Sequence, residues 1–567
     1  MTSKNRARRK GIFKTVAAKV SRGDLKLLLA EVGQYFQQVK KYLAVPHVSS
    51  EEDLRHKLAY IDSLSLTLRN QNFDLECNPT ANECDRRYFH SLASITTHLY
   101  HLCELGFNAA RQLGHLSQPD FLEAYELNDF FKEIEIGLNL IGPALEQGKL
   151  KMAVKLCRVE GRLDDHYTRR FRQVIEELDS GCGQPGNRVT TIMVIHYLER
   201  IGDLFLEIGE EILYIILGEN IKFSQYQALD EGLKEAIDNG QDFDSLWTFH
   251  AIYGGRSGCS IGVVDSDKRE FGGEPVIFKH GPVAKMEKEK ENLMAWAELW
   301  PGLPPAVRAF VPAKGEGEAG LVLEYIPGHT LKDLFMDQAR AREAFSELAR
   351  SLHLMASLWK ETLVESETRA DFVRQTEKRM GPVHALYPEL MNFSGGFGGL
   401  KIKSLDALLH QAGKMEELLP APFAVRIHGD FNLSNIMLDS RTGDFRFIDL
   451  NRSRLSDYVQ DISVMILSIL RLPLRDAAAR ARLSSAARLV HTFALDFAAS
   501  MGDATCPARL AFGLARSYLT SARFEPRQAA AARFIGYSRY LWEKLVAYGN
   551  SGAPWEQFRL DKRVLYI

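Results

Sequence analysis

The sequence contains no apolar run that approaches the roughly 18 to 20 residues needed to cross a bilayer. It also lacks a Cys-x-x-Cys pair, and its seven cysteines are odd in number and scattered along the chain. Neither sign of charge dominates, because the formal net charge is only −2 with 25% charged residues. These absences argue against a membrane-spanning protein, a disulfide framework, a zinc ribbon and a nucleic-acid partner. We expect reduced thiols and a cytoplasmic location.

The beginning of the chain is the exception to this balance of charge. Between Lys4 and Arg22 there are eight basic residues and no acidic one. The segment also lacks the uninterrupted apolar core of a secretory signal. Such an arm is most often a solvated tail, but GIFKTVAAKVS could form a basic amphipathic turn that touches an anionic membrane surface. We therefore expect peripheral membrane contact at most.

The most informative string runs from His428 to Asp449 and reads HGDFNLSNIMLDSRTGDFRFID. FAVRIH, which overlaps the start of this string, and NIML are typical of short strands. SRTGD is typical of a turn, and FRFID is typical of a returning strand. This pattern places Asp430, Asn435 and Asp449 at strand ends. Phosphoryl transfer needs a carboxylate that orients the attacking hydroxyl and further oxygen ligands for magnesium. Asp430 is the candidate base, and Asn435 and Asp449 are candidate metal ligands, unless they lie in ordinary turns.

This string resembles the aminoglycoside phosphotransferase and choline kinase superfamily, whose pattern is close to HGDLHPGNIL followed by an IDF strand end. The resemblance implies a two-lobed protein-kinase-like fold that uses ATP and magnesium. The variant IDLNRSR also resembles the ending found in lipopolysaccharide core kinases. The residues that match the family pattern are His428, Gly429, Asp430, Asn435 and Asp449, whereas Asn432, Leu433 and Asn451 depart from it. These three departures bear on the identity of the substrate more than on the phosphoryl-transfer reaction.

A nucleotide-binding lobe is predicted upstream. LWTFHAIYGGRSGCSIGVVD indicates two strands around a glycine-rich turn, in which Gly255, Ser257 and Gly258 could approach phosphate oxygens closely. EPVIFKHG then places Lys279 at the end of a third strand, where the resemblance implies pairing with the α- and β-phosphates. The alternatives are a plain hairpin and a solvated lysine.

The following segment, MEKEKENLMAWAEL, has the period of a helix. Glu289 shares a face with Leu293 and Trp296 and could point toward Lys279. Glu287 and Glu291 remain competing choices, since any solvated helix face shows alternating charge.

Two further positions follow from the resemblance. AGLVLEYIPGHTL predicts a buried strand and a turn, and the resemblance implies that Glu324 to Ile326 presents backbone groups to adenine. Asp461 matches a family aspartate that braces the catalytic loop, although it could equally cap a helix.

The first half of the chain has a helical pattern. Between about Asp24 and Gly218, apolar residues recur at three- and four-residue spacing. HYLERIGDLFLEIGEEILYIILGE places Glu199, Asp203 and Glu207 at i, i+4 and i+8 on one stripe. Like charges in such a stripe need a metal cluster or an arginine face between them, and Arg200 is expected to point elsewhere.

With its LERIGD core, this string resembles the signature helix of PhoU-family proteins. The resemblance implies two tandem three-helix bundles that can bind iron or zinc through Glu-x-x-x-Asp pairs. In the first copy, HLYHLCELGFNAA has a tyrosine, Tyr100, at the position equivalent to Glu199, which weakens a metal site there. The candidate iron or zinc ligands in the second bundle are Glu199, Asp203, Glu160 and Asp164. A solvated acidic face is the alternative.

The predicted fold class is multidomain, α followed by α+β, with tandem three-helix bundles before a two-lobed protein-kinase-like fold. The expected boundaries are a basic arm (1–23), PhoU-like bundles (24–228, with repeats of about 24–118 and 119–228), a linker (229–244), an amino-terminal kinase-like lobe (245–328) and a carboxy-terminal lobe with a helical substrate region (329–567).

The charge of the last region bears on the acceptor. From Arg471 to the end there are fifteen Lys or Arg against seven Asp or Glu, and Arg452 and Arg454 lie just past Asp449. A pocket for polycationic aminoglycosides should instead gather carboxylates. We therefore expect ATP and a neutral or anionic hydroxyl acceptor, such as a sugar, sugar phosphate or glycolipid, unless the arginine-rich helices merely face solvent. The helical half is expected to regulate the enzyme or dock a protein partner. The alternative is a non-catalytic nucleotide-sensing protein linked to phosphate uptake or envelope function.

Overall fold

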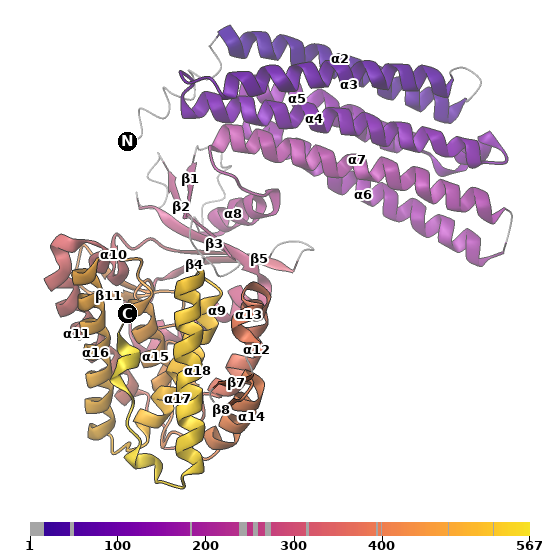
Figure 1. Cartoon of the computed structure of the whole chain (residues 1–567). Helices are drawn as coiled ribbons and strands as arrows, with labels where there is room; N and C mark the ends of the chain where they lie inside the picture. The colour runs from indigo at the N-terminus through magenta and orange to yellow at the C-terminus, as the bar shows by residue number, and fades with distance from the viewer. Residues whose placement is uncertain are drawn as a thin grey trace. The chain divides into compact units, whose positions relative to one another are not determined.

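A computed structural model describes residues 16–45, 50–181, 184–236, 247–252, 259–266, 274–312, 317–392, 395–397, 400–474, 476–525 and 527–566. The chain divides into two compact units, which are Met1–His280 with Val311–Gly320, and Gly281–Phe310 with Leu321–Ile567. The ribbon is shown in Figure 1. Within the described residues, no helix combines the length and the apolar character required to cross a membrane.

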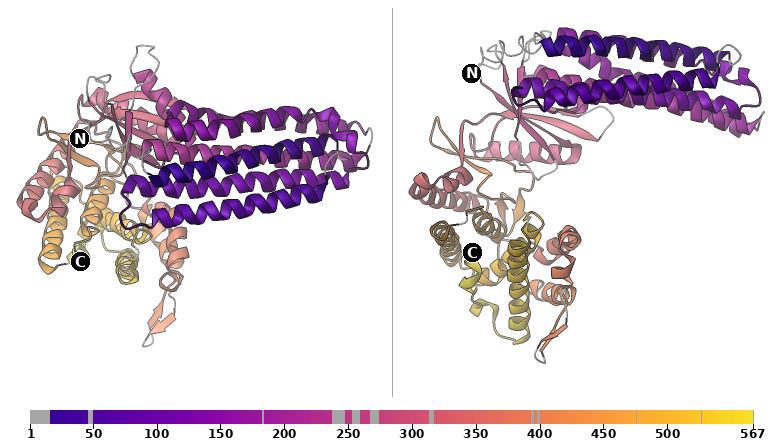
Figure 2. Two further views of the ribbon diagram at one scale, coloured as in Figure 1. Left: turned by 90° about the horizontal axis from the view of Figure 1, so that it is seen from above. Right: turned by 45° about the horizontal axis from the view of Figure 1, so that its top comes forward.

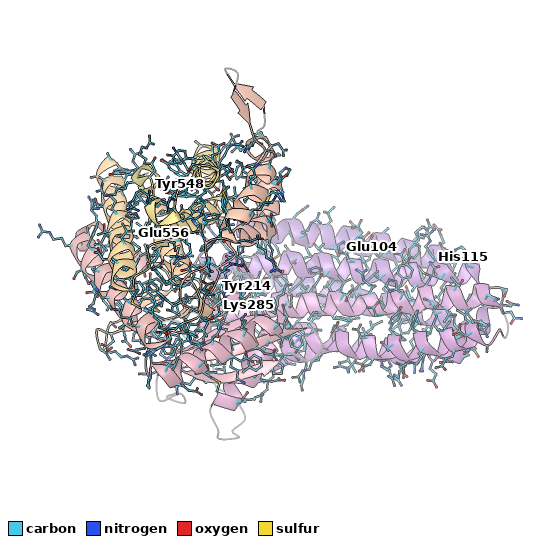
Figure 3. The ribbon with its side chains drawn as sticks, turned by 90° about the horizontal axis from the view of Figure 1, so that it is seen from below. Glu104, His115, Tyr214, Lys285, Tyr548 and Glu556 are labelled. Atoms are coloured by element: carbon cyan, nitrogen blue, oxygen red, sulfur yellow. The ribbon has the colours of Figure 1, made fainter. Side chains whose placement is uncertain are left out.

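Long antiparallel helices fill most of the first unit and run side by side in Figure 2. They form two groups of three, with helices of each group packed on one another and α4 also packed on α7. Figure 3 shows the side chains of Glu104 on α4 and Tyr214 on α7. The helices are α2 (Val16–Ala44), α3 (Glu51–Glu76), α4 (Glu83–Arg111), α5 (Asn128–Gln147), α6 (Leu150–Asp179) and α7 (Pro185–Leu217), with 3-10 turns at Gln112–His115 and Pro119–Tyr125. This arrangement confirms the predicted tandem three-helix bundles.

Glycines in the LERIGD helix allow α6 and α7 to approach closely. A Cβ added to Gly209 would lie 2.3 Å from the Sγ of Cys157, and one added to Gly202 would lie 3.1 Å from the Cα of Glu160. α7 ends at Gly218, whose φ of +85° suits the left-handed conformation that commonly terminates helices. The string singled out in the sequence therefore owes part of its pattern to helix packing.

A five-stranded sheet follows, with strand order β1-β2-β3-β5-β4. Its strands are β1 (Trp247–Ala251), β2 (Ser260–Ser266), β3 (Val276–Pro282), β4 (Val307–Pro312) and β5 (Glu318–Glu324), and the division between the two units passes through it. β1, β2 and β3 pair antiparallel, as the strand and turn pattern predicts. β4 was not predicted from the sequence.

The segment expected as a linker, 229–244, is helical in its first part. α8 (Phe223–Ala236) buries Leu229 and Leu233 completely, and Ala228 lies against the sheet near Phe278 and Gly320. An apolar helix face needs such cover, so these residues belong to a packed element. Residues 237–246 lie outside the described ranges.

The second unit is mainly helical and is centred on α17, in which every residue from Ala508 to Ala522 is buried. α17 packs against α12, α15 and α18. The helices are α9 (Val283–Leu299), α10 (Leu331–Met336), α11 (Ala341–Glu361), α12 (Phe372–Leu386), α13 (Pro388–Met391), α14 (Leu405–Glu416), α15 (Val459–Leu470), α16 (Ala477–Ser500), α17 (Cys506–Ala522) and α18 (Gln528–Asn550). Short 3-10 turns span Gln338–Arg340, Trp555–Gln557 and Lys562–Leu565. The predicted fold class, helical bundles followed by a kinase-like α+β fold, is confirmed.

Short strands in the second unit position the string singled out above. β10 pairs with β11 and with β6, β12 pairs with β9, and β7 pairs with β8. Their bounds are β6 (Gly328–Thr330), β7 (Gly395–Phe397), β8 (Leu400–Ile402), β9 (Val425–Ile427), β10 (Ile436–Asp439), β11 (Phe445–Phe447) and β12 (Arg454–Ser456). β9, β10 and β11 are the three strands that the sequence predicts.

Candidate active site

The loop between β9 and β10 depends on a glycine. Gly429 has a φ of +83°, which L side chains rarely adopt, and an added Cβ would lie 2.2 Å from the carbonyl oxygen of Arg452. The backbone N–H groups of His428 and Gly429 each donate to the carboxylate of Asp461, at 2.8 Å. Asp461, in the first turn of α15, thereby braces the loop.

Burial sets the protonation of the groups beneath this loop. It raises the pKa of Asp461 to about 7, although the two backbone N–H groups that donate to the carboxylate oppose this shift. The side chain of His428 is also fully buried, and burial lowers its pKa, so the ring is neutral. Its neighbours are the rings of Trp296, Phe431 and Phe447. His428 therefore acts as a packing residue of the loop.

Asp430 has a fixed backbone and a partly accessible side chain. Its carbonyl oxygen accepts hydrogen bonds from Nδ2 of Asn435 at 2.9 Å and Nδ2 of Asn432 at 3.2 Å. Its side chain is 25% exposed, and Oδ2 lies 3.1 Å from Nη1 of Arg452. The carboxylate is thus held on a rigid loop where a substrate can reach it, as a general base requires.

Strand pairing brings Asn435 and Asp449 together. Ile436 on β10 is opposite Phe447 on β11, and the N–H of Ile448 donates to the carbonyl of Asn435 at 3.0 Å. Asp449 follows directly, with a φ of +63° that is unusual for a non-glycine residue. Asn435 is in turn bonded to Asp430, so the three predicted residues converge.

The side-chain oxygens of Asn435 and Asp449 are of the type that magnesium prefers. Because Nδ2 of Asn435 donates to the loop, its Oδ1 is the atom available as a ligand, and Asp449 supplies a carboxylate. Nδ2 of Asn451 donates to Oδ1 of Asp449 at 2.9 Å, which orients that carboxylate. Within the described ranges no group of three or more His, Cys, Asp or Glu residues is arranged to hold a metal ion. A magnesium ion bound through one or two protein oxygens and nucleotide phosphates does not require such a group.

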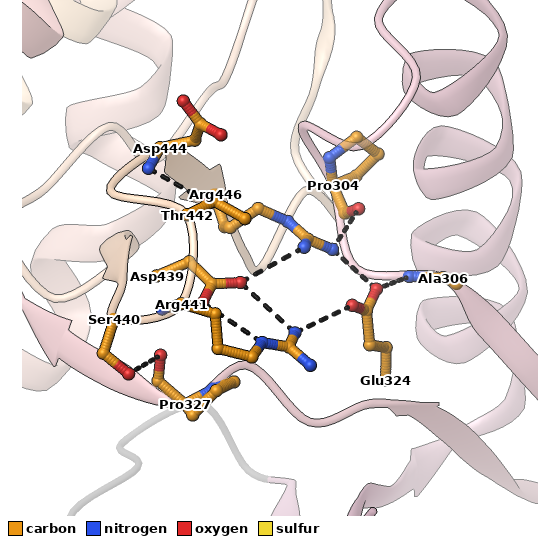
Figure 4. A network of polar contacts seen from close by, with 10 residues as sticks. All are labelled: Pro304, Ala306, Glu324, Pro327, Asp439, Ser440, Arg441, Thr442, Asp444 and Arg446. Atoms are coloured by element: carbon orange, nitrogen blue, oxygen red, sulfur yellow. Dashed lines mark hydrogen bonds and ion pairs between the residues drawn. The ribbon is translucent and has the colours of Figure 1, made fainter. Parts of the chain in front are cut away.

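Glu324, predicted only as a hinge residue that presents its backbone, has a side-chain role that the sequence did not reveal (Figure 4). Its Oε2 lies 2.6 Å from Nη2 of Arg446 and accepts a hydrogen bond from the N–H of Ala306 at 3.0 Å. Arg441 lies 3.7 Å from Glu324 and 3.3 Å from Asp439, so it links the two carboxylates. This network ties the end of β5 to the β10–β11 hairpin.

The neighbouring hinge residue, Ile326, is buried. It lies between β5 and β6, just past the residue that the network holds. The predicted contact of Glu324 and Ile326 with adenine stays a prediction.

Of the predicted phosphate-binding residues, Gly255, Ser257 and Gly258 lie outside the described residues. Lys279 is buried on β3, with 8% of its surface exposed. Glu289 on α9 is 1% exposed, whereas Glu287 and Glu291 are exposed. Burial therefore favours Glu289 among the three glutamates, and its pairing with Lys279 stays a prediction.

α9 is anchored to the residues that follow Asp449. Nδ2 of Asn292 donates to the carbonyl of Leu450 at 2.8 Å, and Nε1 of Trp296 donates to Oγ of Ser453 at 2.7 Å. These two bonds place the helix that carries Glu289 beside the candidate magnesium ligands.

The acidic stripe of the helical half differs from its prediction. Arg200, expected to point elsewhere, pairs with Asp203 at 2.8 Å, because residues three apart are neighbours on a helix. Burial raises the pKa of Glu199 to about 7, with Asp203 and Asp164 adding to the effect. Asp164 is hydrogen-bonded to Glu160 and Glu199. Burial and Asp203 also raise the pKa of Asp164. Within the described residues of this half, no group of three or more His, Cys, Asp or Glu residues is arranged to hold iron or zinc.

Comparisons with known proteins match both halves of the chain. Residues 269–497 match the model of the phosphotransferase enzyme family, and residues 128–212 match the PhoU domain. No curated protein sequence matches the chain.

The solved structures similar to parts of this chain include aminoglycoside phosphotransferases and a PhoU protein. A thermostable mutant of aminoglycoside phosphotransferase APH(4)-Ia is 16% identical, with 53% of this chain and 94% of that chain covered and a TM-score of 0.34. Aminoglycoside phosphotransferase APH(3'')-Id from Streptomyces rimosus is 19% identical, with 55% and 98% covered and a TM-score of 0.31. PhoU from Pseudomonas aeruginosa is 15% identical, with 36% and 98% covered and a TM-score of 0.33.

The strand-end residues, the braced loop and the family matches lead to one assignment. The chain is a PhoU-like helical domain fused to a kinase-like domain that is similar to the phosphotransferase enzyme family.

Proposed function

We propose that the chain transfers the γ-phosphoryl group of ATP to a hydroxyl of a small molecule or glycan, with magnesium. The observation that carries this proposal is the convergence of Asp430, Asn435 and Asp449 around one braced loop. Phosphoryl transfer depends mainly on positioning and charge stabilisation, and these residues are held by the backbone for both.

In the proposed reaction, Asp430 orients the acceptor hydroxyl and takes its proton. The hydroxyl oxygen bonds to the γ-phosphorus, the bond from that phosphorus to the bridging oxygen breaks, and ADP leaves with the electron pair. Asn435 and Asp449 would hold magnesium, which when bound neutralises charge on the phosphates. Lys279, paired with Glu289, and the glycine-rich turn would bind the nucleotide phosphates.

The finer assignment is a sugar, sugar phosphate or glycolipid acceptor in preference to an aminoglycoside. Arg452, a cation, lies 3.1 Å from Asp430, where a polycationic substrate would meet repulsion. We further propose that the PhoU-like half regulates the enzyme or docks a protein partner.

The competing function is a non-catalytic nucleotide sensor. The intact set of Asp430, Asn435 and Asp449 favours an enzyme, since a binding protein has no need of a general base beside its metal ligands.

A transfer assay tests the proposal. The purified full chain is incubated with γ-labelled ATP, magnesium and cell extract fractionated into sugars, lipids and proteins. We expect label in a sugar or lipid fraction, and none with the Asp430→Ala protein. Arg480→Gln, which replaces an exposed arginine on α16, is the matched control and should label the same fraction as wild type. Binding of ATP without transfer to any fraction would favour the sensor.

A further inference from the structure

A cavity of about 360 Å³ in the second unit has six cationic residues among the eleven that line it. They come from α9, from α12 and from the segment after Asp449. The lining cations are Lys288, Arg374, Lys378, Arg379, Arg452 and Arg454, and the one carboxylate is Asp371. So many positive charges around one hollow repel each other unless an anion lies among them. The volume is within the range of small-molecule sites.

A deeply buried arginine, Arg516, interacts electrostatically with three arginines that line this cavity, Arg379, Arg452 and Arg454. Arg516 on α17 is 5% exposed and lies over the ring of Phe372, 5.5 Å from its centroid. Within the described part of the chain, its Nε and Nη2 have no hydrogen-bond partner. Burial, and then Arg379, lower its pKa to about 9. A buried guanidinium with unpaired donors is costly, and here Asp430 offsets the burial and the neighbouring arginines only in part.

Another arginine on α17 shows how a buried guanidinium is usually neutralised. Arg509 is equally buried, but its guanidinium bonds to Asp457 at 2.8 Å and to Asp503 at 2.6 Å. These two carboxylates neutralise it, as is normal for a buried ion. Among the described residues no ion pair of this kind neutralises Arg516, and Asp430 is the carboxylate that favours its charge against burial and the surrounding arginines. An anion in the cavity would add a second negative charge.

The cavity adjoins the proposed catalytic base. Arg452, which lines it, contacts Oδ2 of Asp430 at 3.1 Å. Gln460, also in the lining, donates to the carbonyl of Gly429 at 3.3 Å and accepts from Arg454 at 3.2 Å. A small molecule with an anionic group in the cavity would therefore be able to present a hydroxyl to Asp430.

We propose that this cavity binds a phosphate group of the acceptor, so that the substrate carries both a phosphate and the hydroxyl that is phosphorylated. The inference rests on the proposed function for the identity of the acceptor. Arginine forks bind phosphate oxygens bidentately, and Arg374, Arg379 and Arg452 offer several such forks around one hollow. The phosphate belongs to a soluble sugar phosphate or to a lipid headgroup, and both present the same chemistry.

Matched acceptors test the preference for an anion. Transfer from labelled ATP is measured for glucose, glucosamine and glucose 6-phosphate, and for glycerol, glycerol 3-phosphate and phosphatidylglycerol vesicles. We expect kcat/KM at least about 10-fold higher for a phosphorylated member than for its neutral parent, since a charged hydrogen bond contributes this much. Whether the soluble ester or the vesicle is preferred identifies the source. Equal use of neutral, cationic and phosphorylated members would overturn the proposal.

The double variant Arg374→Gln with Arg379→Gln tests the residues. It should lower kcat/KM for the phosphorylated acceptor at least about 10-fold, mainly through KM, and change ATP hydrolysis without acceptor by less than about 2-fold. The corresponding Arg→Lys variant should recover part of the loss, and Arg480→Gln should match wild type. An equal loss for all acceptors would contradict a phosphate subsite.

A binding measurement separates this inference from the proposed function. Inorganic phosphate is titrated calorimetrically into the full-length wild type, the double variant and Arg480→Gln. Loss of phosphate binding in the double variant alone supports the subsite, even if no transfer is detected, in which case the proposed function fails and the subsite stands. Phosphate binding that is unchanged in the double variant overturns the subsite, whatever the enzymatic activity.

Discussion

Replacing Asp461 with asparagine should separate the stability of this protein from its activity. Asp461 is fully buried and accepts the N–H groups of His428 and Gly429, which position Asp430. Asparagine has the same size but cannot ionise, and it offers one acceptor oxygen where the carboxylate offers two. One of the two hydrogen bonds from the backbone N–H groups of His428 and Gly429 is therefore lost, and the N–H that made it faces the NH2 group of the new asparagine.

Two opposing energies follow from the structure. The lost bond costs roughly 1–3 kcal/mol, because a buried N–H loses its partner. The burial that raises the pKa of Asp461 from 3.8 to about 7 makes ionisation in the folded state unfavourable by roughly 4 kcal/mol, at about 1.36 kcal/mol for each pH unit. In the wild type this group's contribution to stability is fully present below about pH 4 and is lost as the pH rises through 7. The Asp461→Asn variant does not lose this stability as the pH rises, because asparagine does not ionise.

The assay is denaturant unfolding of wild type and Asp461→Asn at pH 5 and pH 8, with turnover measured at pH 8. Between these pH values the stability difference should move by roughly 2–3 kcal/mol in favour of the variant. kcat should nevertheless fall about 10- to 100-fold, because the loop that carries Asp430 is less well held. The exposed Asp444→Asn should match wild type in both respects. A stability difference that is constant with pH, or that moves toward the wild type, would show that the Asp461 carboxyl does not have a raised pKa in the folded protein.

Three other substitutions give direct tests. Asp449→Ala should abolish the magnesium dependence of ATP affinity, measured by nucleotide titration with and without magnesium, and unchanged magnesium-dependent binding would remove Asp449 from the site. Gly429→Ala should destabilise the chain by at least about 2 kcal/mol more than Gly443→Ala in denaturant unfolding. Both glycines have a positive φ, but only at Gly429 would the added Cβ lie within 4 Å of another atom. Equal effects would contradict the close approach of Gly429 to Arg452. Arg446→Met should destabilise the chain by about 2–4 kcal/mol and raise the KM for ATP, because the buried Glu324 loses its ion pair with Arg446. This ion pair holds the pKa of Glu324 below its ordinary value, although burial acts in the opposite direction. Wild-type stability and an unchanged KM would show that the hinge network is dispensable.

The sequence predicted those parts of the fold whose determinants are local. The string from His428 to Asp449 carries its own strands and turn, so the convergence of Asn435 and Asp449 follows from a hairpin of adjacent residues. The helical half was predictable for the same reason, since apolar spacing within each helix defines its buried face.

Long-range pairings were not predictable in this way. Glu324 and Arg446 are 122 residues apart, and nothing near either residue indicates their ion pair. The choice between a brace and a helix cap for Asp461 depends on contacts with residues 32 and 33 positions away. The cationic cavity combines α9, α12 and the segment after Asp449, so the surplus of arginine was visible in the sequence but its location was not.

As the proposed base, Asp430 acts on the acceptor hydroxyl and is not needed to bind the nucleotide. The most direct test is to measure ATP affinity and phosphoryl transfer on the same preparation of Asp430→Ala. We expect ATP affinity within about 3-fold of wild type and transfer reduced by at least about 10²-fold, on the order of what a general base contributes. Transfer at the wild-type rate with intact ATP binding would contradict this role of Asp430.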